Sequence, residues 1–453
     1  MLRAIPEAIG RDDVVSQAGA KILRFPADRA LRYIPCVSAN DSMTDWPYLT
    51  ADLPGVGGEI KRFDDDFVVE EAPLYLPSGQ GTHTYFTIEK RGLTTHAVIQ
   101  HIARLLGRQP YDIGYAGLKD AHGVTRQTFS IEHVDPNRVS ALELGRAKVL
   151  SVDRHTNKLK LGHLAGNRFA IKIRDTVSEP ESAASAVLDV LIRRGLPNYF
   201  GPQRFGVRGD NAQIGLAVLR ENYDEAFALM LGRPGPVDHG AARKAREFFD
   251  AGDFEAAAQS WPRGVFSQQS RLCRALLKTG GDTRKAWRTV DHTMRKLYIS
   301  AFQSGLFNRV LAQRIASIDR LESGDIAWKH VNGACFRVED AATEQPRCDA
   351  LEISPTGPLF GRRMTEAVGT PGQMEAAVLA ECGLRKDQIA APGSGKTSGA
   401  RRPLRVPMGE PTLETGTDDN GPYLLLRFFL PPGAYATNVV REISKNPGDA
   451  VDF

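Results

Sequence analysis

Strand-like alternation of apolar and polar residues occurs near both ends of this chain, and a long segment of helical character separates the two regions. Phe169, Ile171 and Ile173 alternate with polar residues early in the chain, and the run Tyr-Leu-Leu-Leu-Arg-Phe-Phe-Leu occupies residues 423–430. A period of two places alternate side chains on one face of a sheet. We therefore expect the late segment to join the sheet that the early segments build.

The early region predicts a mixed sheet with a covering helix. Residues 59–72, EIKRFDDDFVVEEA, contain strand-like runs, and residues 159–175, LKLGHLAGNRFAIKIRD, have the pattern of a hairpin whose arms flank a Gly-containing loop. Thr94 and Thr95 can cap a helix with Val98, Ile102 and Leu105 on one face, which Gly107 ends. These elements favour an α/β fold of the α+β type, with a mixed, largely antiparallel sheet flanked by helices.

The central region predicts mainly helices. After residues 198–206, NYFGPQRFG, the sequence becomes rich in alanine, as in NYDEAFALMLG and AARKAREFFDAGDFEAAAQSW. The strongest helical pattern begins at Asp282, a suitable N-cap, and has apolar residues at three- and four-residue spacing, namely Trp287, Val290, Met294, Leu297 and Ala301. We expect one long helix there, inside a helical insertion.

Length and composition indicate a soluble globular protein. The chain has 453 residues, of which 42% are hydrophobic and 25% charged, enough for two or three domains with cores of their own. The longest apolar runs, such as residues 423–432, are much shorter than the ~18 residues that a spanning helix needs. We expect no membrane segment and a cytoplasmic protein.

The cysteine and histidine patterns predict neither disulfides nor a metal site. The five cysteines are odd in number and form no CxxC pair, so we expect free thiols: Cys36, Cys273, Cys335, Cys348 and Cys382. The ten histidines include His96 and His101, but none has the spacing of an HExxH motif.

A basic stripe lies within residues 271–296. The net charge of +4 is mild, but this window has only Asp282 and Asp291 as acidic residues. Its basic residues are Arg271, Arg274, Lys278, Arg284, Lys285, Arg288, Arg295 and Lys296. Such a stripe can bind phosphates through counterion release, but the pattern by itself favours a solvated helix face.

Two segments are interpreted as carrying no site. Residues 1–42 have neither a signal-peptide core nor the composition of a transit peptide, and Met43 is a candidate start of translation. Gly395-Lys396-Thr397 resembles the end of a phosphate-binding loop, but Ala390 stands where the first glycine belongs and Pro403 would interrupt the helix that must follow. We interpret this segment as a basic loop.

A polar connection, residues 119–123, lies between two strand-like runs at residues 113–118 and 124–131. It contains Lys119, Asp120 and His122. Asp and Gly are common in strand connections, so from spacing alone Asp120 can be a turn residue and Lys119 a solvated one. A pair of catalytic carboxylates could also come from the acidic run Asp64, Asp65, Asp66, Glu70 and Glu71, although such a run on a strand edge is usually solubilising.

Read together, several separated segments of this chain resemble the TruD family of tRNA pseudouridine synthases. GYAGLKDAHGVTRQTFS (114–130) is similar to the signature around that family's catalytic aspartate, and NYFGPQRFG and SAFQSGLFN (300–308) resemble two others. SPTGPLFGRRM, GARRPLRVP, FFLPPGAYATNVVREI and the early GEIKRFDDDFVVEE also match. The resemblance covers residues 58–443 in order and leaves residues 1–50 outside. Ala121 and Gly123 depart from it, since a basic residue and an alanine are common there.

The resemblance implies that the chain isomerises a uridine of tRNA, position 13 in bacterial members, to pseudouridine with Asp120 as the essential carboxylate. Asp120 can attack C1′ or remove the 2′ proton, and the sequence does not choose between these routes. Both need an ionised carboxylate. No bond is oxidised or hydrolysed, so the reaction implies no cofactor. The partner implied is tRNA; no obligate protein partner is evident, and we expect a monomer.

The resemblance also implies supporting residues. Lys61 matches the lysine that keeps the aspartate ionised, Phe169 is a stacking face for the base and Asn167 is an orienting amide. Periodicity alone favours an ordinary exposed strand lysine for Lys61, and Phe169 would also suit the core of a strand. Tyr435 is a second candidate for the pocket. Gln303 and Asn308 can fix the insertion to the sheet or touch RNA. Candidate RNA contacts are Lys119, Arg204, Arg284, Lys285 and Arg288.

The expected organisation has four parts. Residues 1–50 form a weakly specified extension, residues 51–197 and 401–453 form the two parts of the catalytic domain, and residues 198–400 form a TruD-type insertion. The principal alternative is a catalytically inactive RNA-binding protein on the same scaffold. A glycoside hydrolase would need a second carboxylate in the pocket.

Overall fold

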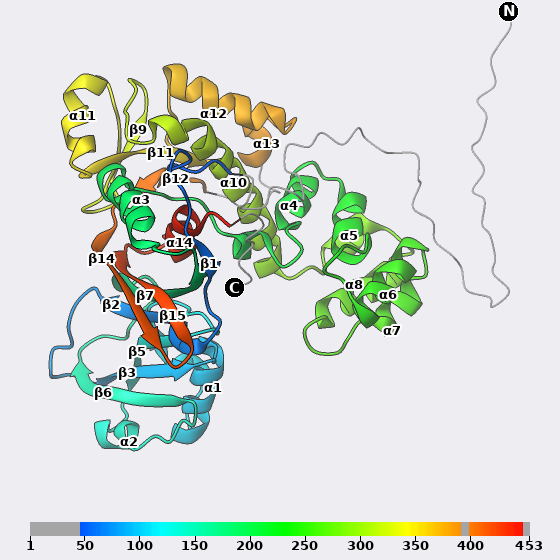
Figure 1. Ribbon diagram of the computed structural model, residues 1–453. Helices are drawn as coiled ribbons and strands as arrows, with labels where there is room; N and C mark the ends of the chain where they lie inside the picture. Colours follow the sequence, from blue (N-terminus) through cyan, green and yellow to red (C-terminus); the bar gives the residue numbers. More distant parts are fainter. Residues whose placement is uncertain (1–45, 391–397, 447–453) are drawn as a thin grey trace, which may run out of the picture.

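The computed structural model describes residues 46–390 and 398–446 (Figure 1). Within this part of the chain the largest sheet has nine strands. Seven follow one path, in the order β14 (Gly409–Asp418), β15 (Gly421–Leu430), β7 (Leu164–Thr176), β2 (Phe67–Pro73), β5 (Val124–Glu132), β3 (His83–Arg91) and β6 (Ala147–His155). The short strands β1 (Gly57–Glu59) and β4 (Gly114–Tyr115) pair with β7 and β5.

The late strands join the early sheet, as the alternation predicts. β15 pairs antiparallel with β7, with Phe428 opposite Phe169 and Leu430 opposite Asn167. β2 runs antiparallel to β7 and parallel to β5, and the other described ladders of this sheet are antiparallel. The predicted mixed, largely antiparallel sheet is therefore confirmed.

The predicted hairpin around residues 159–175 is wrong. β7 lies between β15 and β2, whereas the preceding strand β6 lies at the far edge beside β3. Leu159 belongs to the loop between them, where it packs against Tyr85 and Ala116 and its amide donates to Ser130 Oγ at 2.9 Å. Alternation within one strand identifies β7, but it does not identify the partner of that strand.

Helices cover both faces of the large sheet. They are α1 (Thr95–Leu106), α2 (Pro136–Ser140), α3 (Glu181–Arg194) and α14 (Ala436–Ser444). Thr94 caps α1 by accepting a hydrogen bond from the amide of Ala97, and Gly107 ends the helix in the left-handed conformation. Val98 and Ile102 are buried as predicted, but Leu105 is 44% exposed, and Leu106 packs against the sheet instead.

The central region is mainly helical. Its helices are α4 (Asn211–Leu219), α5 (Tyr223–Leu231), α6 (Gly240–Asp250), α7 (Phe254–Ser260), α8 (Ser267–Lys278), α9 (Thr283–Trp287), α10 (His292–Arg314), α11 (Ala341–Asp349), α12 (Gly369–Glu381) and α13 (Lys386–Ala390). Asp282 caps α9 as predicted, but the single helix expected from this point is two. Asp291 caps α10 by accepting from the amide of Thr293, so the chain turns between the two helices.

The central region also contains a small sheet that the sequence analysis did not anticipate. Its strands, in order, are β10 (Cys335–Arg337), β9 (Ile326–Lys329), β11 (Ile353–Leu359) and β12 (Ala400–Pro403). Immediately after β12, β13 (Arg405–Val406) pairs with β8 (Leu196–Pro197). This pairing, together with the contacts of Asn198 and Phe200 with Arg402, brings residues 196–200 beside residues 402–406.

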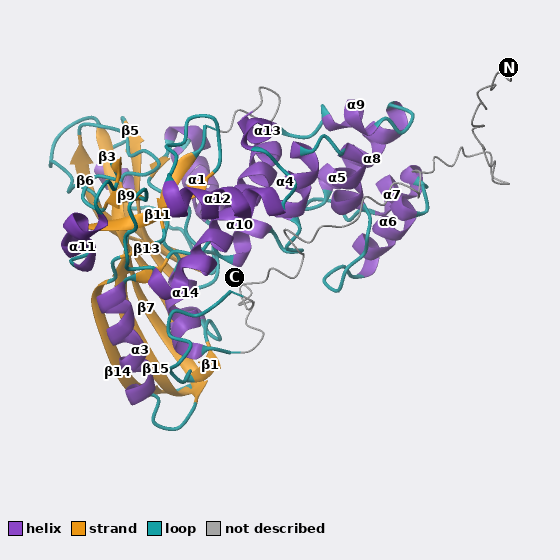
Figure 2. Ribbon diagram, turned by 90° about the horizontal axis from the view of Figure 1, so that it is seen from above, coloured by secondary structure: helices purple, strands orange, loops and turns teal. Residues whose placement is uncertain are grey.

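One apolar core joins the large sheet to the central region. α3 and α14 lie along one face of the sheet (Figure 2), and the side chains of Phe302, Leu306 and Phe307 of α10 enter the same cluster, where they are fully buried. A second cluster, under α1, covers the other face around Phe86 and Phe129. The helices α5–α8 have a separate core. The segments that meet at the sheet face are therefore held by shared burial.

Candidate active site

Asp120 lies on the loop between β4 and β5, beside a lysine from a distant part of the chain. Its Oδ2 is 2.6 Å from Lys61 Nζ, and the two side chains are 21% and 7% exposed. Burial lowers the pKa of Lys61, and the hydrogen bond and charge of Asp120 oppose that effect. The ammonium group also lies 4.3 Å from the centre of the Phe67 ring. The site thus has a close carboxylate–ammonium pair.

Lys90 is a second buried ammonium group at this loop, and the sequence analysis missed it. Its Nζ donates to the backbone oxygen of Asp120 at 2.7 Å and to that of Leu93 at 2.5 Å, and the residue is 1% exposed. Burial lowers the pKa of Lys90 to about 8, opposed by the charge of Asp120. Lys90 shares a face of β3 with Phe86 and Ile88, so alternation along the strand was the signal that could have found it.

Lys119 and Glu71 form a buried ion pair in the wall of the site. Lys119 Nζ is 2.7 Å from Glu71 Oε2, and the side chains are 5% and 3% exposed. The backbone amide of Lys119 donates to Thr95 Oγ1 at 2.9 Å. The interpretations of Lys119 as solvated and of Glu71 as solubilising are therefore wrong. Asp66 is likewise buried, in an ion pair with Arg174. A role of Lys119 in RNA contact stays a prediction.

Phe169 and Asn167 are presented by the same face of β7. The Phe169 ring stacks on Phe428, with centroids 5.3 Å apart, and meets the Phe67 ring edge-on at 6.3 Å. Asn167 Oδ1 is buried and accepts no hydrogen bond from the part of the chain that the structure describes. A buried acceptor of this kind normally has a partner. It is available for a donor on a bound molecule.

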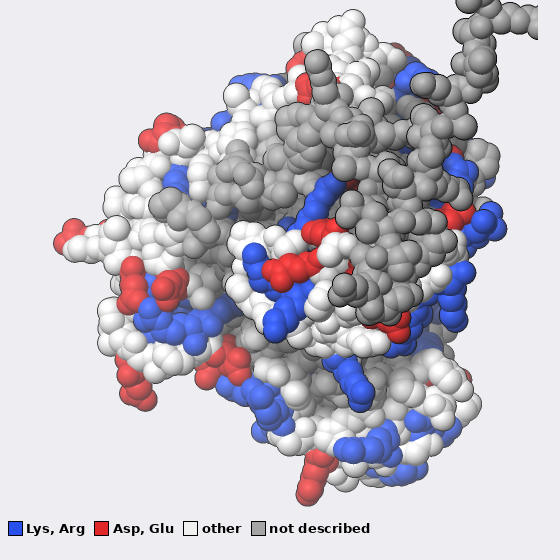
Figure 3. Space-filling model, turned by 90° about the vertical axis from the view of Figure 1, so that its right-hand side faces the viewer, with Lys and Arg blue, Asp and Glu red and all other residues white. Residues whose placement is uncertain are grey.

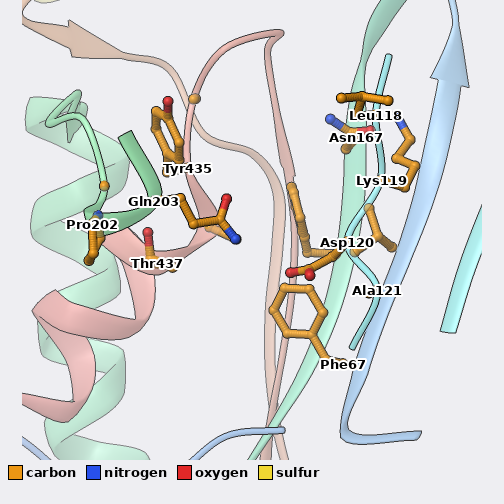
Figure 4. A pocket seen from close by; sticks show the side chains of 15 residues that line it. Phe67, Leu118, Lys119, Asp120, Ala121, Asn167, Pro202, Gln203, Tyr435 and Thr437 are labelled. Atoms are coloured by element: carbon orange, nitrogen blue, oxygen red, sulfur yellow. The ribbon is translucent and has the colours of Figure 1, made fainter. Parts of the chain in front are cut away.

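A cavity of about 390 Å³ brings these residues together. Asp120, Lys119, Asn167, Phe169 and Phe67 line one side, and the opposite side is formed by Gly201, Pro202, Gln203, Ala434, Tyr435 and Thr437. Figure 4 shows the Asp120 carboxylate above the Phe67 ring, facing the side chain of Gln203 across the cavity. The cavity is large enough for a planar ring to lie near the carboxylate. Tyr435 is thus a cavity residue, as the sequence analysis suggested.

Gly123, in the loop that carries Asp120, has a backbone conformation that favours glycine. Gly123 has a φ of 126°, and a Cβ at this position would lie 2.4 Å from the backbone oxygen of Phe67. Any larger residue would strain the turn or push the loop away from β2. The glycine is therefore a local requirement of the loop that carries Asp120.

The polar residues of α10 join the central region to the segment at residues 198–206. Asn308 accepts from the amide of Phe200 at 2.9 Å and donates to its carbonyl at 3.1 Å, and Gln303 donates to the carbonyl of Phe360. Both are buried, which supports a fixing role. Arg204 donates from Nε to Ser304 Oγ at 3.1 Å and packs against Phe200.

The candidate RNA contacts on α9 and at its C-cap are exposed and are not part of the cavity lining. Arg284 pairs with Glu221, and Lys285 with Asp282 at 3.0 Å, whereas no described residue forms an ion pair with Arg288. Figure 3 shows lysine and arginine side chains interspersed with aspartate and glutamate on the face to which the helical region contributes. Their contact with RNA stays a prediction.

Several other expectations can be compared with the described residues. Cys273, Cys335, Cys348 and Cys382 are free, as predicted, whereas Cys36 and Gly395-Lys396-Thr397 lie outside this part of the chain. Residues 1–42 and Met43 also lie outside it. No helix in the described ranges is long and apolar enough to span a membrane. Within the same ranges, no cluster of three or more His, Cys, Asp or Glu is arranged to hold a metal ion.

Comparison with known proteins identifies the family and the fold. A family model described as tRNA pseudouridine synthase D (TruD) matches residues 43–443. The tRNA pseudouridine synthase D of Geobacter metallireducens is 49% identical, over 88% of this chain and 97% of that protein. The enzyme of the same name from Thermus thermophilus is 38% identical, over 88% and 92%. A crystal structure of the TruD protein from Methanosarcina mazei has a TM-score of 0.76 at 28% identity, covering 88% of this chain and 96% of that one.

The fold and these matches define a pseudouridine synthase, an isomerase whose substrate is tRNA. The chain belongs to the TruD family. The family match begins at residue 43, upstream of Gly58, where the sequence analysis began the resemblance. Residues 46–50 are in fact packed against α14, because Glu442 accepts hydrogen bonds from the amides of Leu49 and Thr50 and from Thr50 Oγ1.

Proposed function

We propose that this protein converts uridine 13 of tRNA into pseudouridine and that Asp120 is its essential carboxylate. The choice of position 13 follows from the resemblance of the loop at residues 114–130 to the family signature. The observation that carries the role of Asp120 is its 2.6 Å pairing with Lys61 at the edge of a cavity lined by Asn167 and Phe169.

The reaction breaks the N1–C1′ bond, turns the uracil ring and joins C5 to C1′, after which C5 loses its proton and N1 gains one. A carboxylate can assist by attacking C1′ or by removing the 2′ proton, and both roles need the anion. Lys61 favours the anion because an opposite charge at short distance opposes the effect of desolvation. Lys90 adds a second positive charge at the backbone of the same residue.

The uridine must leave its stack in the folded RNA before Asp120 can reach its sugar. Phe169, supported by Phe428, offers a flat surface for the uracil ring. Asn167 Oδ1, which accepts no hydrogen bond from the described residues, offers an acceptor for the N3–H of uracil. Cytosine has no hydrogen on N3 and would leave this acceptor unsatisfied, so the pair favours uracil.

The test is release of tritium from tRNA labelled at uridine C5, compared between the unmodified protein and Asp120→Asn. Asn keeps the shape of the side chain and removes the charge. We expect release by the former, none by the latter and equal tRNA binding by both. Asp153→Asn, an exposed aspartate on β6, is the matched control and should release tritium at the normal rate.

The same assay tests which uridine is modified and whether the protein is an enzyme or an inactive RNA-binding protein. A tRNA with cytidine at position 13 should release no tritium, and release that persists would move the target to another uridine. Binding without release by the unmodified protein would favour the inactive RNA-binding scaffold. The expected cytoplasmic location, the expected monomer and the absence of a cofactor stay predictions.

A further inference from the structure

Two arginines from distant parts of the chain pack against one ring beside the cavity. The Cζ atom of Arg402, on β12, is 4.1 Å from the centre of the Phe200 ring, and that of Arg204 is 5.5 Å from it. Phe200 also meets the Tyr435 ring edge-on at 6.3 Å. We call Arg204 and Arg402 the arginine pair.

In the described ranges neither arginine of the pair forms an ion pair with a carboxylate, in contrast to the neighbouring Arg401. Arg402 donates to the carbonyl oxygens of Asn198 and Gly433, at 3.2 and 2.9 Å, and to the side chain of Asn198. Neither Arg204 nor Arg402 has an Asp or Glu oxygen within 4.0 Å in the described ranges, whereas Arg401 makes a two-pronged ion pair with Glu375. The pair is therefore a local excess of positive charge.

The guanidinium N–H groups of the arginine pair that donate to no described residue could bind an anion. Arg204 uses Nε for Ser304, and its two Nη atoms donate to no described residue; the same is true of Arg402 Nη1. Burial is the main cause that lowers the pKa of Arg402 to about 10; Tyr435 opposes this effect and the charge of Arg204 adds to it. A bound anion would relieve this repulsion, and guanidinium groups are well suited to phosphate oxygens.

The arginine pair lies next to the cavity wall that faces Asp120. Arg204 follows Gln203, and Arg402 holds the carbonyl of Gly433, which precedes Ala434; Gln203 and Ala434 both line the cavity on the side opposite Asp120. A uridine that enters the cavity brings its two flanking phosphates to the rim. A phosphate that a pair of arginines binds there would fix the distance between the sugar and Asp120.

We propose that Arg204 and Arg402 form a binding site for one phosphodiester that flanks the target uridine. This proposal rests on the proposed function of the cavity, and it assigns to the two residues a joint role in positioning the substrate. It also gives a reason for the meeting of β12 with residues 198–206, which are far apart in the sequence.

The experiment is a binding cycle between arginine variants and tRNAs that carry one uncharged methylphosphonate linkage, 5′ or 3′ of the target uridine. With ordinary tRNA we expect Arg204→Gln and Arg402→Gln each to raise the Kd about tenfold, the scale of a lost charge-assisted hydrogen bond. One of the two methylphosphonates should weaken binding to the unmodified protein similarly. Combined with either variant it should weaken binding no further.

The proposal would be overturned if the arginine variants and the methylphosphonates acted independently. In that case the increases in Kd from variant and methylphosphonate would multiply at both linkages, and the arginine pair would bind neither phosphate. Arg402→Gln can also weaken the fold, since Arg402 holds two backbone segments, so Arg204→Gln and Arg402→Lys are tested beside it, with thermal melting. Arg104→Gln, an exposed arginine on α1, is the control and should leave the Kd unchanged. Binding is measured without turnover, so its outcome is separable from that of the tritium assay.

Discussion

Lys90 is the charged side chain of the site that is most completely removed from water. Its ammonium group donates to two backbone carbonyls, and no Asp or Glu oxygen of the described chain lies within 4.0 Å of it. We infer that this cation supports the charge of Asp120 and fixes the position of the loop. Its low pKa places its titration within an accessible pH range.

At the residue scale, the rate of tritium release should fall as the pH rises through about 8, because Lys90 then becomes neutral. Lys90→Met should be slower by about tenfold or more, the effect of one or more pKa units of lost charge interaction, and should lack this alkaline decline. Lys172→Met, on β7 with Asp418 as its partner, is the control that should keep the decline.

The contribution of Lys90 to the stability of the fold should rise with pH, whereas the rate of tritium release should fall. Because the pKa of Lys90 is lower in the folded state than its ordinary 10.5, the unfolded chain holds the extra proton between about pH 8 and 10.5. The contribution of Lys90 to the free energy of unfolding therefore rises with pH in that window. Denaturant unfolding of the unmodified protein and Lys90→Met would show it. A decline in rate that merely follows a decline in stability would contradict the role assigned to Lys90.

At the scale of elements, a buried ion pair ties the start of β2 to β7. Arg174 donates to both carboxylate oxygens of Asp66, at 2.6 to 3.0 Å, and to Asp418 at the β14–β15 turn. Asp66 lies between Lys61 and Phe67 in the sequence. The pair therefore holds in place the segment that carries two residues of the site.

Asp66→Asn should lower the free energy of unfolding by about 3 kcal/mol, since removing one partner of a buried pair leaves the other charge poorly compensated. We also expect slower tritium release, because the segment that bears Lys61 loses its anchor. Asp65→Asn is the matched control: its pair with Arg91 is exposed on both sides, so its loss should cost less than about 1 kcal/mol. Equal losses from the two variants, measured by denaturant unfolding, would contradict the argument.

At the scale of the whole molecule, the basic stripe is expected to hold the body of the tRNA while the cavity holds one nucleotide. Changing Arg284, Lys285 and Arg288 together to Gln should raise the Kd and reduce the slope of log K against log salt by about one to two, because two of the three already have acidic neighbours. The rate at saturating tRNA should not change. The slope is measured by filter binding from low to moderate salt. An unchanged slope would show that the stripe is a solvated helix face and does not bind phosphates.

Local patterns in the sequence predicted much of the fold. The cap of α1, the alternation in β7 and β15 and the loop with Asp120 were all identified from residues close together in the chain. The predictions failed where the structure depends on contacts between distant residues. The partner of β7 and the burial of Asp66 and Glu71 are examples. The break between α9 and α10 was missed for another reason, because the local cap Asp291 was not recognised.

The sequence by itself determined the family of this protein and the candidates Asp120, Lys61, Asn167 and Phe169, because these lie in segments that are recognisable one at a time. Only the tertiary structure decided which charges meet. The position of Lys90 under Asp120, the ion pair of Lys119 and the approach of Arg402 to Arg204 depend on strand order and on packing across hundreds of residues. Alternation along a strand specifies the face that a side chain occupies, but the group that it meets there is set by whichever element packs against that face.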